Sequence, residues 1–291
     1  MDDFVAGWIS GGIGLLIGHP FDTVKTRLQT ISTFRSPLHT FITTIKQENI
    51  HGLYKGMAGP FLSIGFQNSL LFSGYGWTLK YMHPNIEKMD KNSLPMYEIV
   101  GASMVGTCMQ LVPGIPIENI KTKLQVQRTL LNTKASFSGP VNCATKLLRH
   151  KGLRGLYEGS GAMVVRDMIG YLFYIPVYEM LRRFFIGRKF NETATQLIAG
   201  GMAGSISWLS ICPIEIVKNK IQTGEQLGLK EKNAKAIVKS IWNKNGLRGF
   251  YKGGLVLIVR GFIVNSVVFL VYEKSLLFVN ENMLRNNCIL D

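Results

Sequence analysis

Three ten-residue stretches of the sequence combine one acid with two bases at a fixed spacing. They begin at Pro20, Pro116 and Pro213 and read PFDTVKTRLQ, PIENIKTKLQ and PIEIVKNKIQ. The acid precedes the first base by three residues, so on a helix the two side chains share one face and can interact. Because the copies are evenly spaced over 291 residues, they indicate a triplicated unit whose function requires the charges.

The chemistry that these residues predict is ion pairing inside an apolar environment. The acids and first bases are Asp22, Glu118, Glu215, Lys25, Lys121 and Lys218. An unpaired charge in a membrane span is costly, so we expect the six charges to satisfy one another around an interior cavity. The sequence has no nucleophile–base spacing, metal-ligand cluster or phosphate loop. It therefore predicts no catalytic residue, no metal site and no cofactor.

Six apolar windows surround the motifs and approach the roughly 20 residues that cross a bilayer as a helix. They cover residues 4–20, 60–79, 96–117, 161–181, 195–217 and 254–271. Buried helices of a soluble protein are the alternative interpretation.

Each of the three repeated units is predicted to consist of a long helix, an amphipathic connector helix and a second long helix. The predicted ranges are 4–31, 37–48 and 59–80, then 96–126, 139–150 and 161–186, and finally 195–223, 233–244 and 254–279. A proline inside a membrane helix bends it, so equivalent kinks are expected at the three motif prolines.

The net charge of +15 is concentrated in the connectors. Basic amphipathic connectors beside apolar spans favour an anionic lipid surface, and nucleic-acid recognition motifs are absent. Each connector ends in an aromatic, glycine-containing turn, at residues 51–56, 155–159 and 249–253. Such a helix start favours a lipid phosphate, although a plain glycine turn is the alternative. The cysteines, at positions 108, 143, 212 and 288, have no metal-ligand spacing and are expected to pack.

These features resemble the mitochondrial carrier family, whose signature is P-x-[DE]-x-x-[KR]-x-[KR] followed by an aromatic-basic-glycine turn. The resemblance covers essentially the whole chain. It implies an all-α membrane protein with a single carrier domain over 1–291, which is divided into repeats 1–92, 93–190 and 191–291. Six tilted transmembrane helices with pseudo-threefold symmetry would be joined by short amphipathic helices on the matrix side. It also implies a monomer in the mitochondrial inner membrane, cardiolipin as the anionic phospholipid, and alternating access for a small-molecule substrate. Because the first span follows Met1 at once, no cleavable presequence is expected.

The resemblance assigns the charged motifs to a matrix-side gate. Asp22 would pair with Lys121, Glu118 with Lys218, and Glu215 with Lys25, and the pairs would be braced by Gln29, Gln125 and Gln222. On the cytoplasmic side the family carries [FY]-[DE]-x-x-[KR]. Residues 178–182 match it fully, whereas 75–79 lack both charges and 272–276 lack the base. The expected cytoplasmic gate is therefore incomplete and consists of Tyr75, Tyr178, Glu179, Arg182, Tyr272 and Glu273.

The family's substrate contact points fall on Ser63/Ile64, Arg166/Asp167 and Arg260/Gly261, and His19 and Trp208 are added as candidates. The branch most similar to this chain holds the carnitine/acylcarnitine carrier, basic amino-acid carriers and their uncharacterised relatives. An arginine beside an aspartate can bind both ends of a zwitterion, although the two can instead neutralise each other. Trp208 can hold an alkylated ammonium by a cation–π contact or simply pack. His19 can contact the substrate or the carbonyl freed by Pro20.

The expected function is therefore transport of a small zwitterionic or cationic metabolite, such as an amino acid, a methylated amino acid, carnitine or acylcarnitine. Tricarboxylates and phosphate fit less well, because Asp167 repels multiply charged anions. Nucleotides fit less well because the second contact point is charged, whereas adenine carriers of the family have a glycine and an aliphatic residue there. A carrier of another small solute, or a membrane adaptor that does not transport, are the alternatives.

Overall fold

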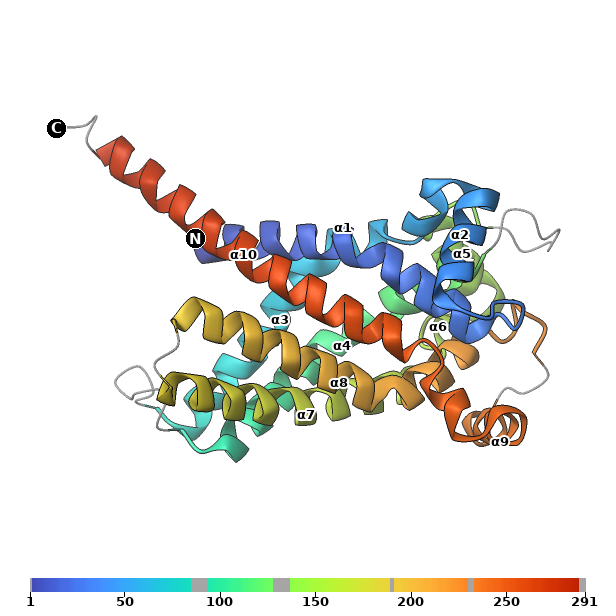
Figure 1. Cartoon of the computed structure of the whole chain (residues 1–291). Coiled ribbons are helices and arrows are strands. Elements are labelled where there is room, and N and C mark those ends of the chain that lie inside the picture. The colour runs from blue at the N-terminus through green and yellow to red at the C-terminus, as the bar shows by residue number, and fades with distance from the viewer. Residues whose placement is uncertain (1, 85–93, 128–136, 189–190, 230–232, 288–291) are drawn as a thin grey trace.

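Six long helices stand side by side in a closed ring (Figure 1). The computed structural model describes residues 2–84, 94–127, 137–188, 191–229 and 233–287, without the side chains at 2–9, 192–194, 196, 269 and 272–287. In ring order the helices are α1 (Asp2–Thr30), α3 (Ala58–Met82), α4 (Met96–Val126), α7 (Ser160–Gly187), α8 (Glu192–Thr223) and α10 (Gly254–Asn287). Helix α10 packs against α1 and closes the ring. The predicted helical fold is confirmed, and α10 extends beyond its predicted end at 279.

Three short helices lie together at one end of the ring, and both chain termini lie at the other (Figure 1). They are α2 (Pro37–Glu48), α5 (Pro140–Lys151) and α9 (Ala234–Asn245), each followed by a shorter helical turn: η1 (Ile50–Tyr54), α6 (Leu153–Leu156) or η4 (Gly246–Tyr251). The start of α2 is fixed by Ser36, whose side chain accepts a hydrogen bond from the His39 backbone N–H at 3.2 Å.

Each connecting turn ends in a glycine that adopts a left-handed conformation. The φ angles are 84° at Gly56, 80° at Gly159 and 84° at Gly253. This region is open to glycine and strained for other residues, so the turn predicted in each repeat has a backbone reason for its glycine. A lipid phosphate at these turns remains a prediction.

Apolar clusters attach the short helices to the long ones. In the third repeat, Ile216 of α8 packs with Ile237 and Ile241 of α9 and with Leu257 of α10. The first and second repeats have similar clusters around Leu53 and Cys143. This packing fixes the ends of α1, α4 and α8, where the charged motifs lie.

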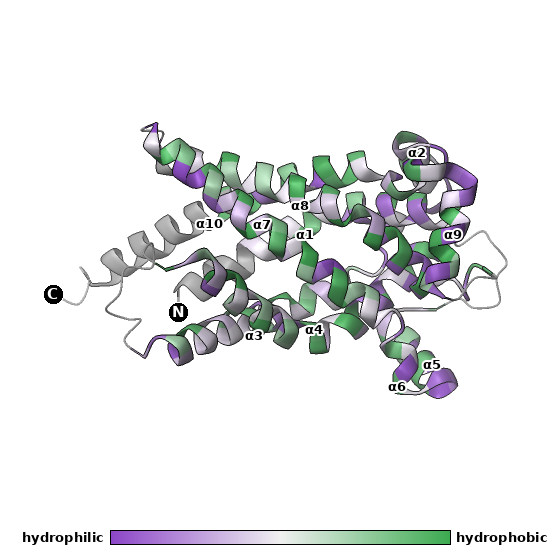
Figure 2. Ribbon diagram, turned by 90° about the horizontal axis from the view of Figure 1, so that it is seen from below, coloured by the Kyte–Doolittle hydropathy of each residue, from purple (hydrophilic) through white to green (hydrophobic). Residues whose placement is uncertain are grey.

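The distribution of polarity is the reverse of that in a soluble protein. Leu62 is 80% exposed and Phe72 68% exposed, whereas Lys218 and Glu215 are only 1% and 3% exposed. Apolar residues cover the long helices, and hydrophilic residues gather at the end that carries the short helices (Figure 2). A lipid-facing exterior explains this pattern, because large exposed apolar surfaces are otherwise rare.

Three segments of the described chain are long and apolar enough to cross a membrane, at Met96–Val126, Leu197–Thr223 and Ala234–Val268. The prediction of six spans is thus supported for three segments and remains a prediction for the others. Helix α7 carries charges in its middle and near its end, which lowers its average hydropathy. The helical assignment runs unbroken through Pro20, Pro116 and Pro213, so the kinks also remain predictions.

Candidate functional site

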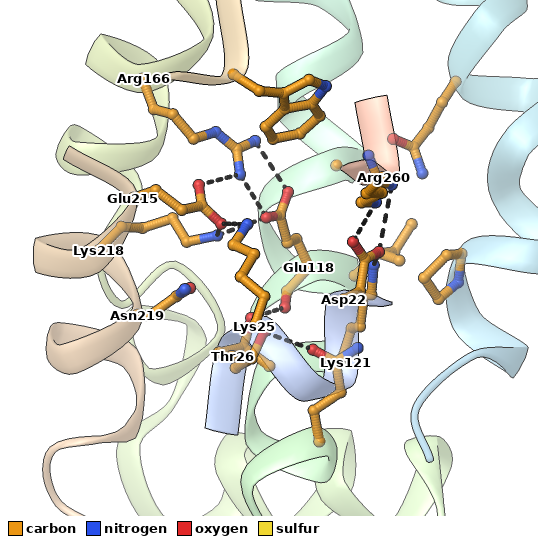
Figure 3. Close-up of a pocket in the computed structure, with 17 residues that line it drawn as sticks. Asp22, Lys25, Thr26, Glu118, Lys121, Arg166, Glu215, Lys218, Asn219 and Arg260 are labelled. Atoms are coloured by element: carbon orange, nitrogen blue, oxygen red, sulfur yellow. Dashed lines mark hydrogen bonds and ion pairs between the residues drawn. The ribbon is translucent and has the colours of Figure 1, made fainter. Parts of the chain in front are cut away.

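Helices α1, α4 and α8 contact one another near the end that carries the short helices. Three ion pairs join them there: Lys121 Nζ lies 2.6 Å from Asp22 Oδ2, Lys25 Nζ lies 2.7 Å from Glu215 Oε1, and Lys218 Nζ lies 2.5 Å from Glu118 Oε1. These are the three pairings that the sequence resemblance implies, and each joins two different repeats (Figure 3). Their role as a gate is a functional hypothesis that the geometry makes possible.

Arg166 of α7 connects two of these pairs to each other. Its guanidinium donates to both carboxylate oxygens of Glu118, at 2.5 and 3.0 Å, and to Glu215 Oε2 at 3.1 Å (Figure 3). Its Nε also donates to Asp167 Oδ1 at 2.7 Å. A planar guanidinium is suited to several carboxylates at once, so Arg166 acts as the centre of the acidic group.

Arg260 of α10 occupies a similar position beside the third pair. Its guanidinium contacts the Asp22 carboxylate, with Nη2 3.3 Å from Oδ2 (Figure 3). It also lies over the indole ring of Trp208, 4.9 Å from the ring centroid, while Lys25 Nζ lies 5.3 Å from the same centroid. Both distances permit cation–π attraction, so protein cations already occupy the indole.

These side chains enclose a cavity of about 170 Å³. Among its described lining residues, five are cationic, namely Lys25, Lys121, Lys218, Arg166 and Arg260, and three are acidic, namely Asp22, Glu118 and Glu215. Asp167, which contacts Arg166 without lining the cavity, is a fourth acid. The described group therefore has one more positive than negative charge.

The three motif glutamines do not hydrogen-bond to the ion pairs in the part of the chain that the structure describes. Gln29 Oε1 accepts from Asn219 Nδ2 at 2.7 Å, and Gln125 Oε1 accepts from Thr26 Oγ1 at 3.1 Å. The backbone carbonyl of Gln222 accepts from Lys123 Nζ. The glutamines thus link the helices that carry the charges, and any bracing of the pairs is indirect.

Besides Asp167 and Gly261, the predicted substrate contacts His19, Ser63 and Ile64 lie outside the lining of the cavity. His19 is fully buried, and its Nε2 lies 3.0 Å from the Lys55 carbonyl oxygen, so the ring has a structural partner. Ser63 Oγ accepts from Gln67 Nε2 at 2.7 Å, and Ile64 lies against Gly11 of α1. His19 therefore contacts the Lys55 carbonyl of the turn after α2 and not the carbonyl freed by Pro20, and Ile64 lies against α1. Among the described residues, Gln67 is the polar residue by which α3 lines the cavity.

Several lining residues were missed by reasoning from the sequence. They are Gln67, Thr26, Thr122, Asn219, Pro60, Gly114 and Ile117. Thr26, Thr122 and Asn219 stand one residue after the first base of their motifs, so the repeat itself was a signal for them. Gln67 had no such signal, because it lies one helical turn beyond the contact point assigned to α3.

The predicted cytoplasmic gate is only partly described. Glu179 contacts Arg182 at 3.4 Å and Arg183 at 2.7 Å within α7, and Tyr178 stacks on Tyr174. Tyr75 packs against a buried cluster that contains Leu79. The side chains of Tyr272 and Glu273 lie outside the described residues.

Comparison with known proteins gives the same family over most of the chain. The family model described as "Mitochondrial carrier protein" matches residues 1–85, 92–189 and 190–282. Solute carrier family 25 member 45 of Mus musculus is 36% identical over 95% of this chain and 98% of its own. Member 48 of Danio rerio is 31% identical over 96% and 97% of the two chains. The mitochondrial basic amino acids transporter of Bos taurus is 34% identical over 92% and 88%.

Proposed function

The chain belongs to the mitochondrial carrier family, and from that premise we propose that it transports a small zwitterionic metabolite across the mitochondrial inner membrane. The carried molecule has a carboxylate and an ammonium group, as amino acids, methylated amino acids and carnitine-like compounds do. The name of the bovine relative, a basic amino acids transporter, supports this class of substrate.

The observation that carries this proposal is that Arg166 is held by carboxylates on every side. A substrate carboxylate reaches Arg166 only by displacing Glu118, Glu215 or Asp167. A displaced carboxylate that stays buried without a partner costs several kcal/mol. A zwitterion satisfies both protein groups. Its carboxylate binds Arg166, and its ammonium binds the protein carboxylate that Arg166 has released.

This exchange also links binding to opening. Glu118 and Glu215 belong to two of the three motif ion pairs. A substrate that draws Arg166 away from Glu118 and Glu215 weakens the contacts of the closed end, and it does so only while it is bound. Alternating access needs such an effect, because a ligand shifts two conformations only when it interacts differently with each of them.

A simple carboxylate is the second candidate, because the described group has one surplus positive charge. Such an anion neutralises the surplus without needing a released carboxylate. A non-transporting adaptor is less well supported, since three ion pairs between repeats are present where a gate is expected.

Uptake into liposomes that contain the purified protein tests these alternatives. We expect lysine, arginine, trimethyl-lysine or carnitine to be taken up. A betaine should compete with uptake, whereas choline, which lacks the carboxylate, should not. Competition by simple carboxylates alone would favour the second candidate, and equal competition by choline would contradict both.

The variant Arg166→Lys is the matched test of the site. A lysine keeps the charge but cannot make the bidentate contact with Glu118, so uptake should fall by at least tenfold while the protein stays folded. The exposed Arg154 on α6 provides the control, and Arg154→Lys should transport as the unmodified protein does.

A further inference from the structure

The backbone carbonyl of Val112 in α4 lacks its normal helical donor. In a helix it would accept from the N–H four residues later, and that residue is Pro116, which has no N–H. Val112 is 62% exposed, and it lies on the opposite face of α4 from Gly114 and Lys121, which line the cavity. The carbonyl is therefore on the lipid-facing side, where an acceptor without a donor is costly.

The hydroxyl group of Tyr157 supplies a donor. Tyr157 lies in the turn between α6 and α7, and its Oη donates to the Val112 carbonyl oxygen at 3.0 Å. The side chain of Asn119 donates to two backbone carbonyls of α6, at 2.9 Å each. Val112 precedes Pro116 and Asn119 follows it, so α6 and its turn bridge the proline joint of α4.

The other two repeats have the same two residues without this bond. The motif prolines and the tyrosines of the turns are Pro20 and Tyr54, Pro116 and Tyr157, and Pro213 and Tyr251. The carbonyls that lack a donor in the first and third repeats belong to Leu16 and Leu209, which are each 38% exposed. Among the described residues, no tyrosine hydroxyl donates to either of them. The bond is thus specific to the repeat in which the freed carbonyl is most exposed.

We propose that Tyr157 is a positioning residue of the matrix-side gate. Its bond fixes the part of α4 beyond Pro116 relative to the start of α7. That part of α4 carries Glu118, and α7 carries Arg166, which donates to both Glu118 oxygens. A change of angle at the joint would move Glu118 away from Arg166 and from Lys218. The inference rests on the proposed gate, but it does not depend on which metabolite is carried.

The bond should favour the closed matrix end. Opening that end separates Glu118 from Lys218, which belong to different repeats, and requires the ends of α4 and α8 to move apart. A contact shifts the balance of two conformations only when it differs between them. The Tyr157 bond depends on the angle of α4 at Pro116, so it is made in the closed state and weakened when α4 bends. Its removal should therefore populate the open matrix end.

Cysteine labelling in proteoliposomes of known orientation tests the proposal, with the exposed natural cysteines replaced by serine. Gln67→Cys lines the central cavity and should react with a membrane-impermeant maleimide from the matrix side only when the matrix end opens. In Tyr157→Phe this reaction should become about 2- to 10-fold faster, which is the change expected for one hydrogen bond. Tyr251→Phe makes the same change where the hydroxyl has no described hydrogen-bond partner, and it should leave the rate unchanged.

Two proline variants show whether the bond acts through the freed carbonyl. Pro116→Ala returns a backbone N–H to the Val112 carbonyl, so Tyr157→Phe should have no further effect in this background. Pro113→Ala is the matched control, because it returns an N–H to the carbonyl of Met109 and leaves that of Val112 without one. Tyr157→Phe should keep its full effect there. Thermal unfolding shows that each variant is folded.

The proposal is overturned if Tyr157→Phe leaves the matrix-side reaction of Gln67→Cys unchanged, even where it lowers the unfolding temperature, because the hydroxyl would then only stabilise the fold. It is also overturned if Tyr251→Phe has the same effect, or if the effect of Tyr157→Phe persists in Pro116→Ala. If Pro116→Ala does not fold, the comparison of Tyr157→Phe with Tyr251→Phe decides on its own. No substrate is added, so an error in the proposed substrate class would not change these results.

Discussion

Arg166 and Arg260 each serve two groups of partners. The sequence resemblance places both among the substrate contacts, and in the structure both hold carboxylates of the motif ion pairs. We infer that substrate and closed end compete for the same guanidinium groups. On this proposal, the two arginines that would bind the substrate also order the motif carboxylates.

The pairing of Asp22 with Lys121 can be tested by exchanging the two charges. Asp22→Lys and Lys121→Asp should each lower the unfolding temperature and abolish uptake, since removing one partner of a buried pair costs about 3–5 kcal/mol. The double variant should be more stable than either single variant. Recovery should be partial, because the new lysine faces Arg260, which contacts Asp22 in the unmodified protein. A double variant no more stable than the singles would show that the pair does not form.

The indole of Trp208 gives a prediction about methylated substrates. Arg260 and Lys25 lie over the ring, so a substrate ammonium must compete with them for it. If a quaternary ammonium makes this contact, Trp208→Leu should reduce its uptake by roughly 2- to 30-fold relative to an unmethylated amine, from a contribution of about 0.5–2 kcal/mol. Uptake of trimethyl-lysine and lysine measures the ratio, and Trp208→Phe is the control that keeps an aromatic face. Equal losses for the two substrates would mean that Trp208 only packs.

The repeated motif identified the charged residues, and the family resemblance implied the partners of Asp22, Glu118 and Glu215 that the structure contains. The contact between Arg166 and Glu118 did not follow, because it depends on how α7 is rotated against α4.

At the scale of elements, helix types and most boundaries could be predicted to within a few residues. Apolar windows, motif prolines and turn glycines are local signals, and α2 and α5 begin within one residue of the predicted position. The continuation of α10 to Asn287 was missed, because its last turns are polar and lack an apolar period. Local sequence does not show how far a helix continues beyond the membrane.

The turn glycines give a prediction for these elements. At Gly56 the backbone is left-handed, and an added Cβ would lie 2.9 Å from the Lys121 carbonyl oxygen. Gly56→Ala should therefore destabilise the protein by at least about 1–2 kcal/mol, which is the cost of the left-handed conformation alone. Thermal unfolding measures the loss.

Gly76→Ala is the matched control for this change. Gly76 lies within α3 and has nothing within 4 Å of the added Cβ. Its replacement should be neutral or stabilising by up to about 1 kcal/mol, since alanine is the better helix former. If Gly56→Ala were as stable as this control, the turn would not depend on glycine.

At the scale of the whole molecule, the ion pairs differ between the two ends. At the end with the short helices, the three motif ion pairs join different repeats, and Arg166 and Arg260 add further contacts between repeats. At the other end, the described pairs are those of Glu179 with Arg182 and Arg183 of its own helix α7. His83, which follows α3, also pairs there with Glu98 of α4. We therefore expect the substrate-free carrier to rest closed at the matrix end and accessible from the cytoplasmic side.

Cysteine labelling in proteoliposomes measures this preference. Gln67→Cys, which lines the central cavity, should react with a membrane-impermeant maleimide from the cytoplasmic side, and substrate should raise its reaction from the matrix side. Thr33→Cys, exposed at the end with the short helices, should react only from the matrix side and reports orientation. Predominant labelling of Gln67→Cys from the matrix side would reverse the proposed resting state.

Two of the four natural cysteines should interfere little with this experiment, because they are buried. Cys212 is buried, as is Cys143, and burial raises the pKa of the Cys143 thiol to about 11. The reactive thiolate of Cys143 is therefore scarce at neutral pH, and its labelling should increase only as the pH rises toward that value. Exposed Cys108 and Cys288, which lies outside the described residues, should be replaced by serine.

The contact between α1 and α10 has a consequence for how the molecule assembles. Gly14 and Gly18 of the first helix face Val268 and Val264 of the last, so one wall of the ring joins residues separated by most of the chain. Contacts of such large sequence separation raise the contact order and carry the largest loop-closure entropy. We expect this wall to form last, after α10 has been inserted, and to leave one edge of α1 facing lipid until then. Because both termini lie at the same end of the ring, a circular permutant that joins them and opens the chain in another connector would make this contact local and should assemble faster.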